Sequence, residues 1–203
     1  ILRNIGFNPI EGNICDIKNK HNNFRGIVSL TRFNGIIRDT TYTGYTDEEL
    51  EILQDNKLID LIAIFANHAP SPLRPEFPDF TKESDRIAQP YGIEFLSETW
   101  KDPNETGHYA RINAGNYNVT INNSCKIKCD SGKYIRIGNL DDDDNYFACY
   151  CKKEEFPTAL FIADSGFLCE SNSNTPGPGL IDKSDNKRFV WHWFKELKKE
   201  CKK

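Results

Sequence analysis

The cysteines are the feature that most limits how this chain can fold. Seven cysteines occur in 203 residues, and four of them form two close pairs, Cys125-x3-Cys129 and Cys149-x-Cys151. Alternation along neighbouring strands places all four side chains on inward faces. Cys149 and Cys151 would lie about 7 Å apart along one strand, which is too far for a bridge between them.

We therefore expect the paired cysteines to form disulfides elsewhere, either between the two pairs or with Cys15 and Cys169. Because seven is odd, one thiol remains. Cys201 lies in the charged C-terminal tail, and it is the candidate for this odd cysteine and for a disulfide that joins two chains.

A four-thiolate zinc site is the alternative use of Cys125, Cys129, Cys149 and Cys151. Structural zinc sites commonly use two Cys-x2-Cys knuckles, whereas these pairs have three and one intervening residues and fall on predicted strands. We therefore favour disulfides and expect no metal or cofactor. A zinc site would instead indicate an intracellular protein.

Several features favour a secreted protein. The sequence contains no methionine, as expected of a chain processed by removal of a secretory signal. Glycosylation sequons begin at Asn104, Asn118 and Asn122. No apolar run approaches the roughly 20 residues of a membrane-spanning helix. The net charge of −4, with acids and bases interleaved, disfavours nucleic-acid and membrane-surface partners.

The first half of the chain predicts mixed structure. Residues 1–24 are expected to form an irregular arm, and residues 25–38 a hairpin that turns at Asn34-Gly35. Thr46 and Glu49 have the spacing of a capping box and predict a helix over 47–55. The apolar run 58–65 predicts a buried strand, with continuation of the helix as the alternative. A Pro-rich loop spans 69–79, and residues 83–98 are ambiguous, with a strand suggested at 92–96.

The second half has the alternation of short antiparallel strands, so residues 108–170 are expected to form a β-rich core. An apolar stripe that includes Phe189, Trp193 and Phe194 predicts a C-terminal helix over 185–200. Together the patterns predict one α+β domain over 1–203. Its antiparallel sheet would be sandwich- or barrel-like and stabilised by disulfides.

One segment resembles a known family. Asp164-Ser165-Gly166 is similar to the nucleophile segment of chymotrypsin-like serine proteases, but Ala163 replaces their first glycine. The resemblance implies a histidine base, and His68 lacks the cysteine that follows that base in the family. The resemblance covers about seven residues, so we assign no family on it and interpret the segment as a turn.

The remaining polar motifs give weaker evidence for a function. The histidines, which are His21, His68, His108 and His192, have no metal-ligand spacing. The run 141–144 of four aspartates could bind calcium, but Tyr146 occupies the position where an EF-hand requires glycine. Such a run is usually a solvated acidic loop.

The sequence therefore favours a secreted, non-enzymatic binding protein, effector-like, that recognises a protein, glycan or small ligand through loops 69–79, 139–145 and 171–179. The alternatives are a secreted hydrolase that uses Ser165 or a histidine–carboxylate pair, and a zinc-stabilised intracellular interaction domain.

Overall fold

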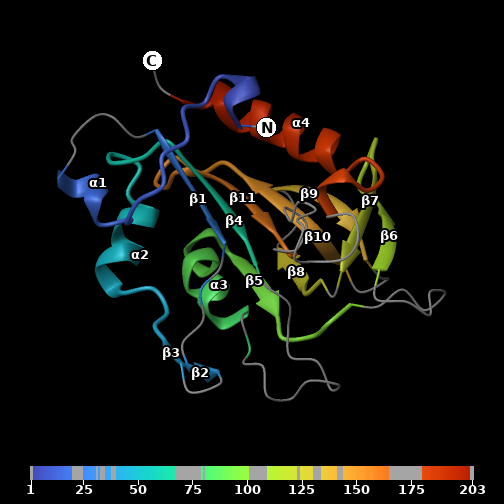
Figure 1. Ribbon diagram of the computed structural model, residues 1–203, viewed down its shortest axis with the longest axis horizontal. Helices are drawn as coiled ribbons and strands as arrows, with labels where there is room; N and C mark the ends of the chain where they lie inside the picture. Colours follow the sequence, from blue (N-terminus) through green and yellow to red (C-terminus); the bar gives the residue numbers. More distant parts are fainter. Residues whose placement is uncertain are drawn as a thin grey trace.

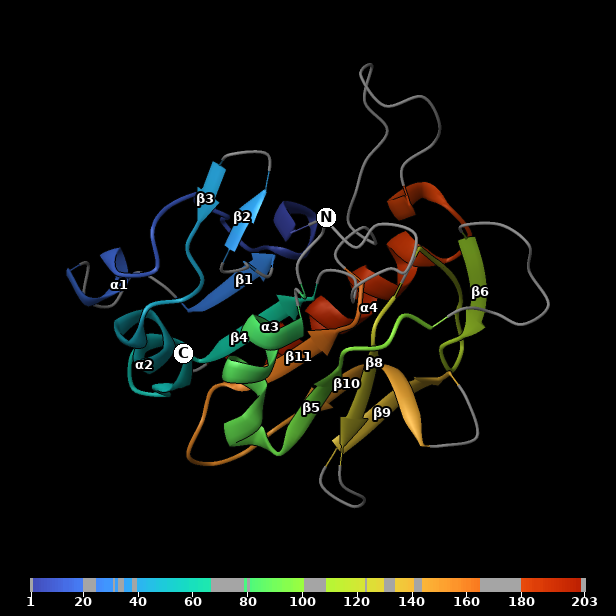
Figure 2. The same ribbon diagram turned by 90° about the horizontal axis from the view of Figure 1, so that it is seen from below.

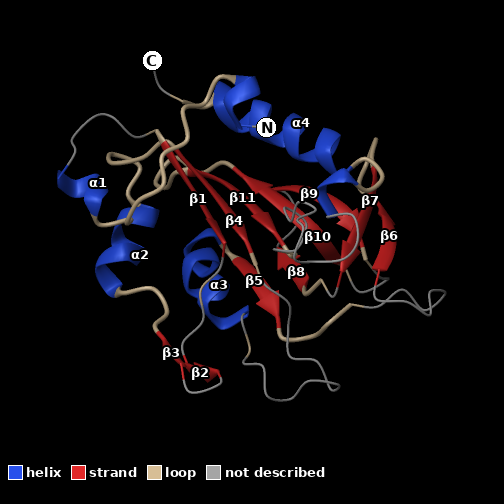
Figure 3. Ribbon diagram, in the orientation of Figure 1, coloured by secondary structure: helices blue, strands red, loops and turns tan. Residues whose placement is uncertain are grey.

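The protein is a mixed α+β structure built on a curled sheet, with the C-terminal helix across one face (Figures 1 and 3). In this computed structural model the described residues are 2–19, 25–30, 32, 35–37, 40–66, 79, 81–100, 109–122, 124–129, 134–140, 144–164 and 180–201.

The helical elements are 3-10 turn η1 (Leu2–Ile5), α1 (Asp16–Asn19), α2 (Asp47–Gln54), α3 (Thr81–Ala88), η2 (Gln89–Tyr91), η4 (Leu180–Asp182) and α4 (Asn186–Lys199). The strands are β1 (Gly26–Leu30), β2 (Gly35–Ile37), β3 (Thr40–Tyr42), β4 (Leu61–Phe65), β5 (Ile93–Leu96), β6 (Tyr109–Asn113), β7 (Asn118–Asn122), β8 (Lys126–Cys129), β9 (Tyr134–Asn139), β10 (Asn145–Cys151) and β11 (Thr158–Ile162).

The main sheet is mixed, not purely antiparallel as the sequence suggested. Its order is β1-β4-β11-β10-β8-β5, with β9 paired to β10 as well. Strands β1, β4 and β11 are parallel, and the others pair antiparallel. The sheet is curled (Figure 2), and β10 pairs with β11 over 148–151 and with β8 over 145–146.

The predicted hairpin over 25–38 is wrong. β1 pairs in parallel with β4, and β2 forms its hairpin with β3. The Asn34-Gly35 signal was misleading because the apolar run of β1 is satisfied by burial against β4, which lies far along the chain.

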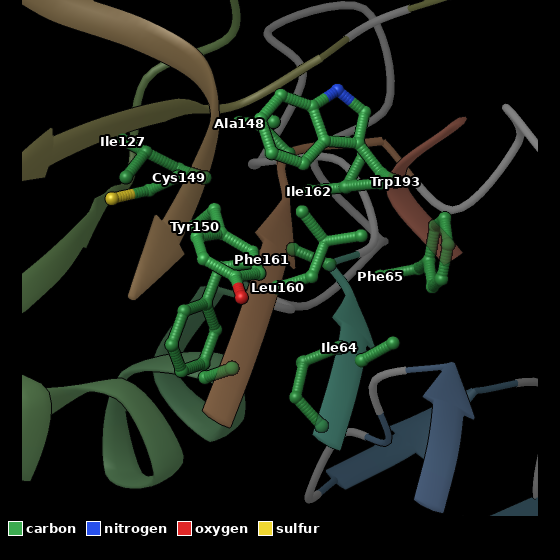
Figure 4. Packing of buried hydrophobic residues seen from close by; sticks show 14 of the residues in the cluster. Ile64, Phe65, Ile127, Ala148, Cys149, Tyr150, Leu160, Phe161, Ile162 and Trp193 are labelled. Carbon is green, nitrogen blue, oxygen red and sulfur yellow. The ribbon is translucent and has the colours of Figure 1, made fainter. Parts of the chain in front are cut away.

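Helix α4 covers one face of the sheet with aromatic side chains (Figure 4). Trp193 packs on Tyr150 of β10, and Phe194 stacks on Phe65 of β4 with ring centroids 6.3 Å apart. At its start, the Thr120 amide of β7 donates to Asn186, and the Asn186 side-chain amide donates back to the Thr120 carbonyl, both at 2.7 Å. The predicted C-terminal helix is therefore confirmed, and its apolar stripe faces the sheet.

The opposite face is covered by α3 and η2 (Figures 1 and 2). Tyr91 packs against Phe161 of β11, and Phe95 of β5 meets the same ring edge-on. Strands β4, β10 and β11 are therefore buried throughout, because both faces of the sheet are covered.

The helix over 47–55 is confirmed as α2, with the full capping box. The Glu49 amide donates to Thr46 Oγ1 at 3.2 Å, and the Thr46 amide donates to Glu49 Oε2 at 3.0 Å. The strand interpretation of 58–65 is also confirmed, as β4, and the strand at 92–96 is confirmed as β5. The arm over 1–24 is less irregular than expected, since it contains η1 and α1.

The disulfide frame is not present in this structure. None of the described cysteines, which are Cys15, Cys125, Cys129, Cys149, Cys151 and Cys201, forms a disulfide, and Cys169 lies outside the described residues. The four central cysteines are buried, as the alternation predicted.

The positions of the four central thiols explain why they do not form the expected set of disulfides. The Cys125 thiol donates to the Ala163 carbonyl at 3.2 Å, and Cys149 is directed away from Trp193, beside Ile127 (Figure 4). A hydrogen bond donated to Cys129 and burial both raise the pKa of the Cys149 thiol. Burial also raises the pKa of Cys151, to about 11. Cys129 and Cys149 are thus neighbours, while Cys125 bonds elsewhere.

The four thiols proposed for a zinc site are not grouped as metal ligands in this structure. In the described part of the chain, no group of three or more histidine, cysteine or acidic side chains is placed to hold a metal ion. None of the helices in that part has the length and apolar character needed to cross a bilayer.

Candidate binding groove

Strand β1 forms one edge of the main sheet, and its register determines which backbone groups are available there. The Arg25 carbonyl accepts the Leu61 amide at 3.1 Å, and Gly26 lies opposite Leu61. Backbone groups alternate in direction along a strand, so those of Ile27 and Ser29 face β4. The N–H and C=O groups of Gly26 and Val28 consequently point away from β4, toward the side on which no described strand pairs with β1.

Two hollows flank this edge, one on each face of the sheet. Gly26 and Val28 of β1 line both of them, as do Ile10 and Glu11 of the N-terminal arm. The larger hollow also contains Leu61 and Phe194, so it lies on the α4 face. The smaller one is lined by Ile27 and Ser29, which point to the opposite face because they alternate with Gly26 and Val28. We call the two hollows together the β1 groove.

The hollows differ in size and chemistry. The larger has a volume of about 1180 Å³, and the smaller about 180 Å³. Apolar side chains in the larger one are Leu2, Phe7, Pro9, Ile10, Val28, Leu61 and Phe194. The smaller one carries polar groups from Glu11, Asn13, Asp16, Ser29 and Arg32. Small-molecule pockets typically measure about 300–1,000 Å³, so the larger hollow is generous for a small ligand.

The outer wall of the groove is the N-terminal arm, fixed by a turn at Gly6. The Gly6 amide donates to the Arg3 carbonyl, and the Phe7 amide to the Leu2 carbonyl, both at 3.0 Å. Gly6 has a φ of +82°, a left-handed conformation that favours glycine, and a Cβ there would collide with the Lys198 ammonium. The turn therefore depends on glycine.

Helix α4 holds this arm through Lys198. Its ammonium donates to the Ile5 carbonyl at 2.7 Å and lies 5.8 Å from the centre of the Phe7 ring. Ile5 itself is buried in the core. The wall is thus anchored by one apolar side chain and one charged hydrogen bond.

The larger hollow is basic although the chain as a whole carries a charge of −4. Its cations are Arg3, Arg25, Lys198 and Lys199, against one carboxylate, Glu11. Arg25 pairs with Asp60 at 3.3 Å, and Lys199 with Glu196 at 2.6 Å. Within the described residues Arg3 and Lys198 have no carboxylate partner, so the hollow keeps uncompensated positive charge.

Exposed apolar side chains gather at the same place. Five large apolar side chains are exposed among the described residues, and Ile10, 67% exposed, and Val28, 41% exposed, both line the groove. Apolar groups rimmed by charges mark interaction sites.

A partly buried polar network lies beside the smaller hollow. Arg32 donates to both carboxylate oxygens of Glu49 at 2.9 and 3.0 Å, and its guanidinium lies 5.1 Å from the centre of the Tyr45 ring. The Tyr45 hydroxyl is 2.7 Å from Ser29 Oγ. Burial raises the pKa of Tyr45, which keeps it neutral at physiological pH. The network fixes the side chains that line this part of β1.

The predicted glycosylation sites are only partly described. Asn118 on β7 is exposed, but Thr120 of the same sequon is buried, with its hydroxyl 2.8 Å from Ser184 Oγ. The side chain of Asn122 and all of Asn104 lie outside the described residues.

Most of the residues predicted for a hydrolase lie where the structure gives no description. Ser165, His21, His68 and His108 lie outside it. His192 is described, and it packs between the rings of Tyr117 and Trp193.

The predicted recognition loops are also mostly outside the described residues. Loop 69–79 is described only at Asp79, and 171–179 not at all. Asp144, in the acidic loop 139–145, accepts the Tyr146 hydroxyl at 2.8 Å.

Sequence reasoning missed the β1 groove because its lining comes from segments near residues 2–11, 25–28, 61 and 194–201 that share no motif. The chain matches no protein-family model, and no curated protein is significantly similar to it.

Proposed function

We propose that this chain is a non-enzymatic binding protein and that the β1 groove is its recognition surface. The observation that carries the proposal is the larger hollow, about 1180 Å³, in which an apolar floor lies beside uncompensated cations. Its partner would combine apolar groups with negative charge, because such a partner removes apolar surface from water and meets Arg3 and Lys198.

Secretion forms part of this proposal. It is supported by the exposed Asn118 of one sequon. The pair Cys129 and Cys149 is the one we propose to form a disulfide in an oxidising compartment, because their thiols already contact each other.

The groove can be tested with a probe that has the proposed chemistry. Anilinonaphthalene sulfonate is aromatic and carries one negative charge, and N-phenylnaphthylamine is its uncharged counterpart. We expect the native protein to bind the sulfonate with saturable fluorescence and to bind the neutral dye more weakly.

Charge variants locate the bound dye. Arg3→Glu reverses a charge that has no carboxylate partner among the described residues, and it is expected to weaken sulfonate binding roughly tenfold. Lys195→Glu makes the same charge change on α4, where the ammonium lies over Trp191 and outside the groove. If the two variants bind the dye equally, the groove is not the site and the proposal is wrong.

A further inference from the structure

The two hollows of the β1 groove lie on opposite faces of one open strand edge. Gly26 and Val28 direct their backbone donors and acceptors outward between them. An extended segment placed beside β1 would satisfy these groups and would send alternate side chains to opposite faces of the sheet. The outward backbone groups of β1 could therefore pair with an added strand, and the two hollows could receive its alternating side chains.

We infer that the partner in the β1 groove is an extended, acidic segment of another protein that joins the sheet as an additional strand along β1. This inference rests on the proposed function and specifies the class of partner. Every second side chain of the segment would enter the larger hollow, against Phe7, Ile10 and Phe194. The intervening side chains would face the smaller hollow, near Ser29 and Arg32.

Charge decides between a foreign segment and a second copy of this chain. In a symmetric dimer along β1, the edges of two copies would bring Arg25 and the cations of the larger hollow close to their own equivalents. Like charges brought together in an interface oppose association. An acidic segment instead places its carboxylates near Arg3 and Lys198, which have no carboxylate partner among the described residues.

Proline at Val28 tests strand addition directly. The Val28 N–H points away from β4, so Val28→Pro removes an outward donor and leaves the register of β1 with β4 intact. Val28→Thr is the matched control, because it keeps the N–H and a β-branched side chain of similar size. The probe is a short fluorescein-labelled peptide that alternates valine with threonine and ends in glutamates, measured by fluorescence polarisation.

We expect the native protein and Val28→Thr to bind this peptide alike, and Val28→Pro to bind it at least about tenfold more weakly. A second measurement covers the case in which Val28→Pro folds poorly. Native protein is titrated with the same peptide methylated on the backbone nitrogens that would face β1, and the same loss is expected. A peptide ending in lysines in place of glutamates should also bind more weakly.

Equal binding of the peptide and its methylated form would overturn strand addition. If Arg3→Glu still weakens binding of the sulfonate dye in that case, the groove remains a binding site and only the class of partner is wrong. Dimerisation of the native protein that is lost in Val28→Pro would likewise overturn the inference, in favour of a second copy as the occupant.

Discussion

The groove wall depends on one ammonium group, and replacing it gives the sharpest stability prediction. Lys198→Met keeps the length and apolar stem of the side chain but removes the charge. The variant loses the hydrogen bond to the Ile5 carbonyl at 2.7 Å and the contact with the Phe7 ring. Hydrogen bonds to charged groups contribute about 1.5–3 kcal/mol when buried, and the exposure of Lys198 reduces this to about 1 kcal/mol.

Amide hydrogen exchange can measure this loss of stability in the N-terminal arm itself. The Gly6 and Phe7 amides are bonded only while the turn after η1 is closed. A cost of about 1 kcal/mol should make both exchange about fivefold faster through local opening. Amides in β10 and β11 should exchange at the native rate, because the core does not depend on the arm in the same way.

The neighbouring lysine is the control. Lys199→Met makes the same change one residue along, where the ammonium pairs only with Glu196 on the helix surface. Such exposed pairs contribute little, so the arm should keep its native exchange rate. If both variants accelerate Gly6 and Phe7 equally, or neither does, then Lys198 does not hold the arm and our account of the wall is wrong.

Two further predictions concern buried polar groups. Glu49→Gln should lower the free energy of unfolding by about 2 kcal/mol, because the buried carboxylate binds Arg32 and the Thr46 amide. The control Glu48→Gln, at a surface ion pair, should lower it by under about 0.5 kcal/mol. Urea titration measures both values, and equal losses would contradict the role of the Glu49 network. The pKa of the Cys149 thiol is raised by its hydrogen bond to Cys129 and by burial, so above about pH 9 the unfolded chain releases a proton that the native protein keeps, and stability falls as pH rises. In the reduced protein, where Cys129 and Cys149 carry thiols, the urea midpoint should therefore fall between pH 8 and pH 10 and fall less in Cys149→Ala. Equal slopes would contradict a raised pKa of the Cys149 thiol.

Helices α2 and α4 were predicted from the sequence and helix α3 was not, and the difference lies in the side chains that each helix buries. The capping residues of α2 and the aromatic stripe of α4 are local signals, and both helices form where those signals predict. Helix α3 has no such signal, because its buried face includes Thr81, Glu83 and Ser84. Glu83 is stable there because it accepts the Tyr45 amide and pairs with Arg86, contacts that no local pattern reveals.

Long-range pairing explains the remaining differences. The antiparallel strands of the second half follow from alternation, but the parallel contact of β1 with β4 joins segments more than 30 residues apart. The same contact creates the open edge at Gly26 and Val28, and the arm and α4 then build the groove around it. Since each piece of the groove is unremarkable in sequence, the site could be found only once the sheet order was known.

The most direct test of the account is the exchange of the β1 amides, followed by nuclear magnetic resonance with and without the acidic peptide. We predict rapid exchange for the Gly26 and Val28 amides and slow exchange for Ile27 and Ser29 in the free protein, with Gly26 and Val28 becoming protected when the peptide binds. Protection of all four amides in the free protein, or no change on binding, would contradict the open edge on which the proposed groove depends.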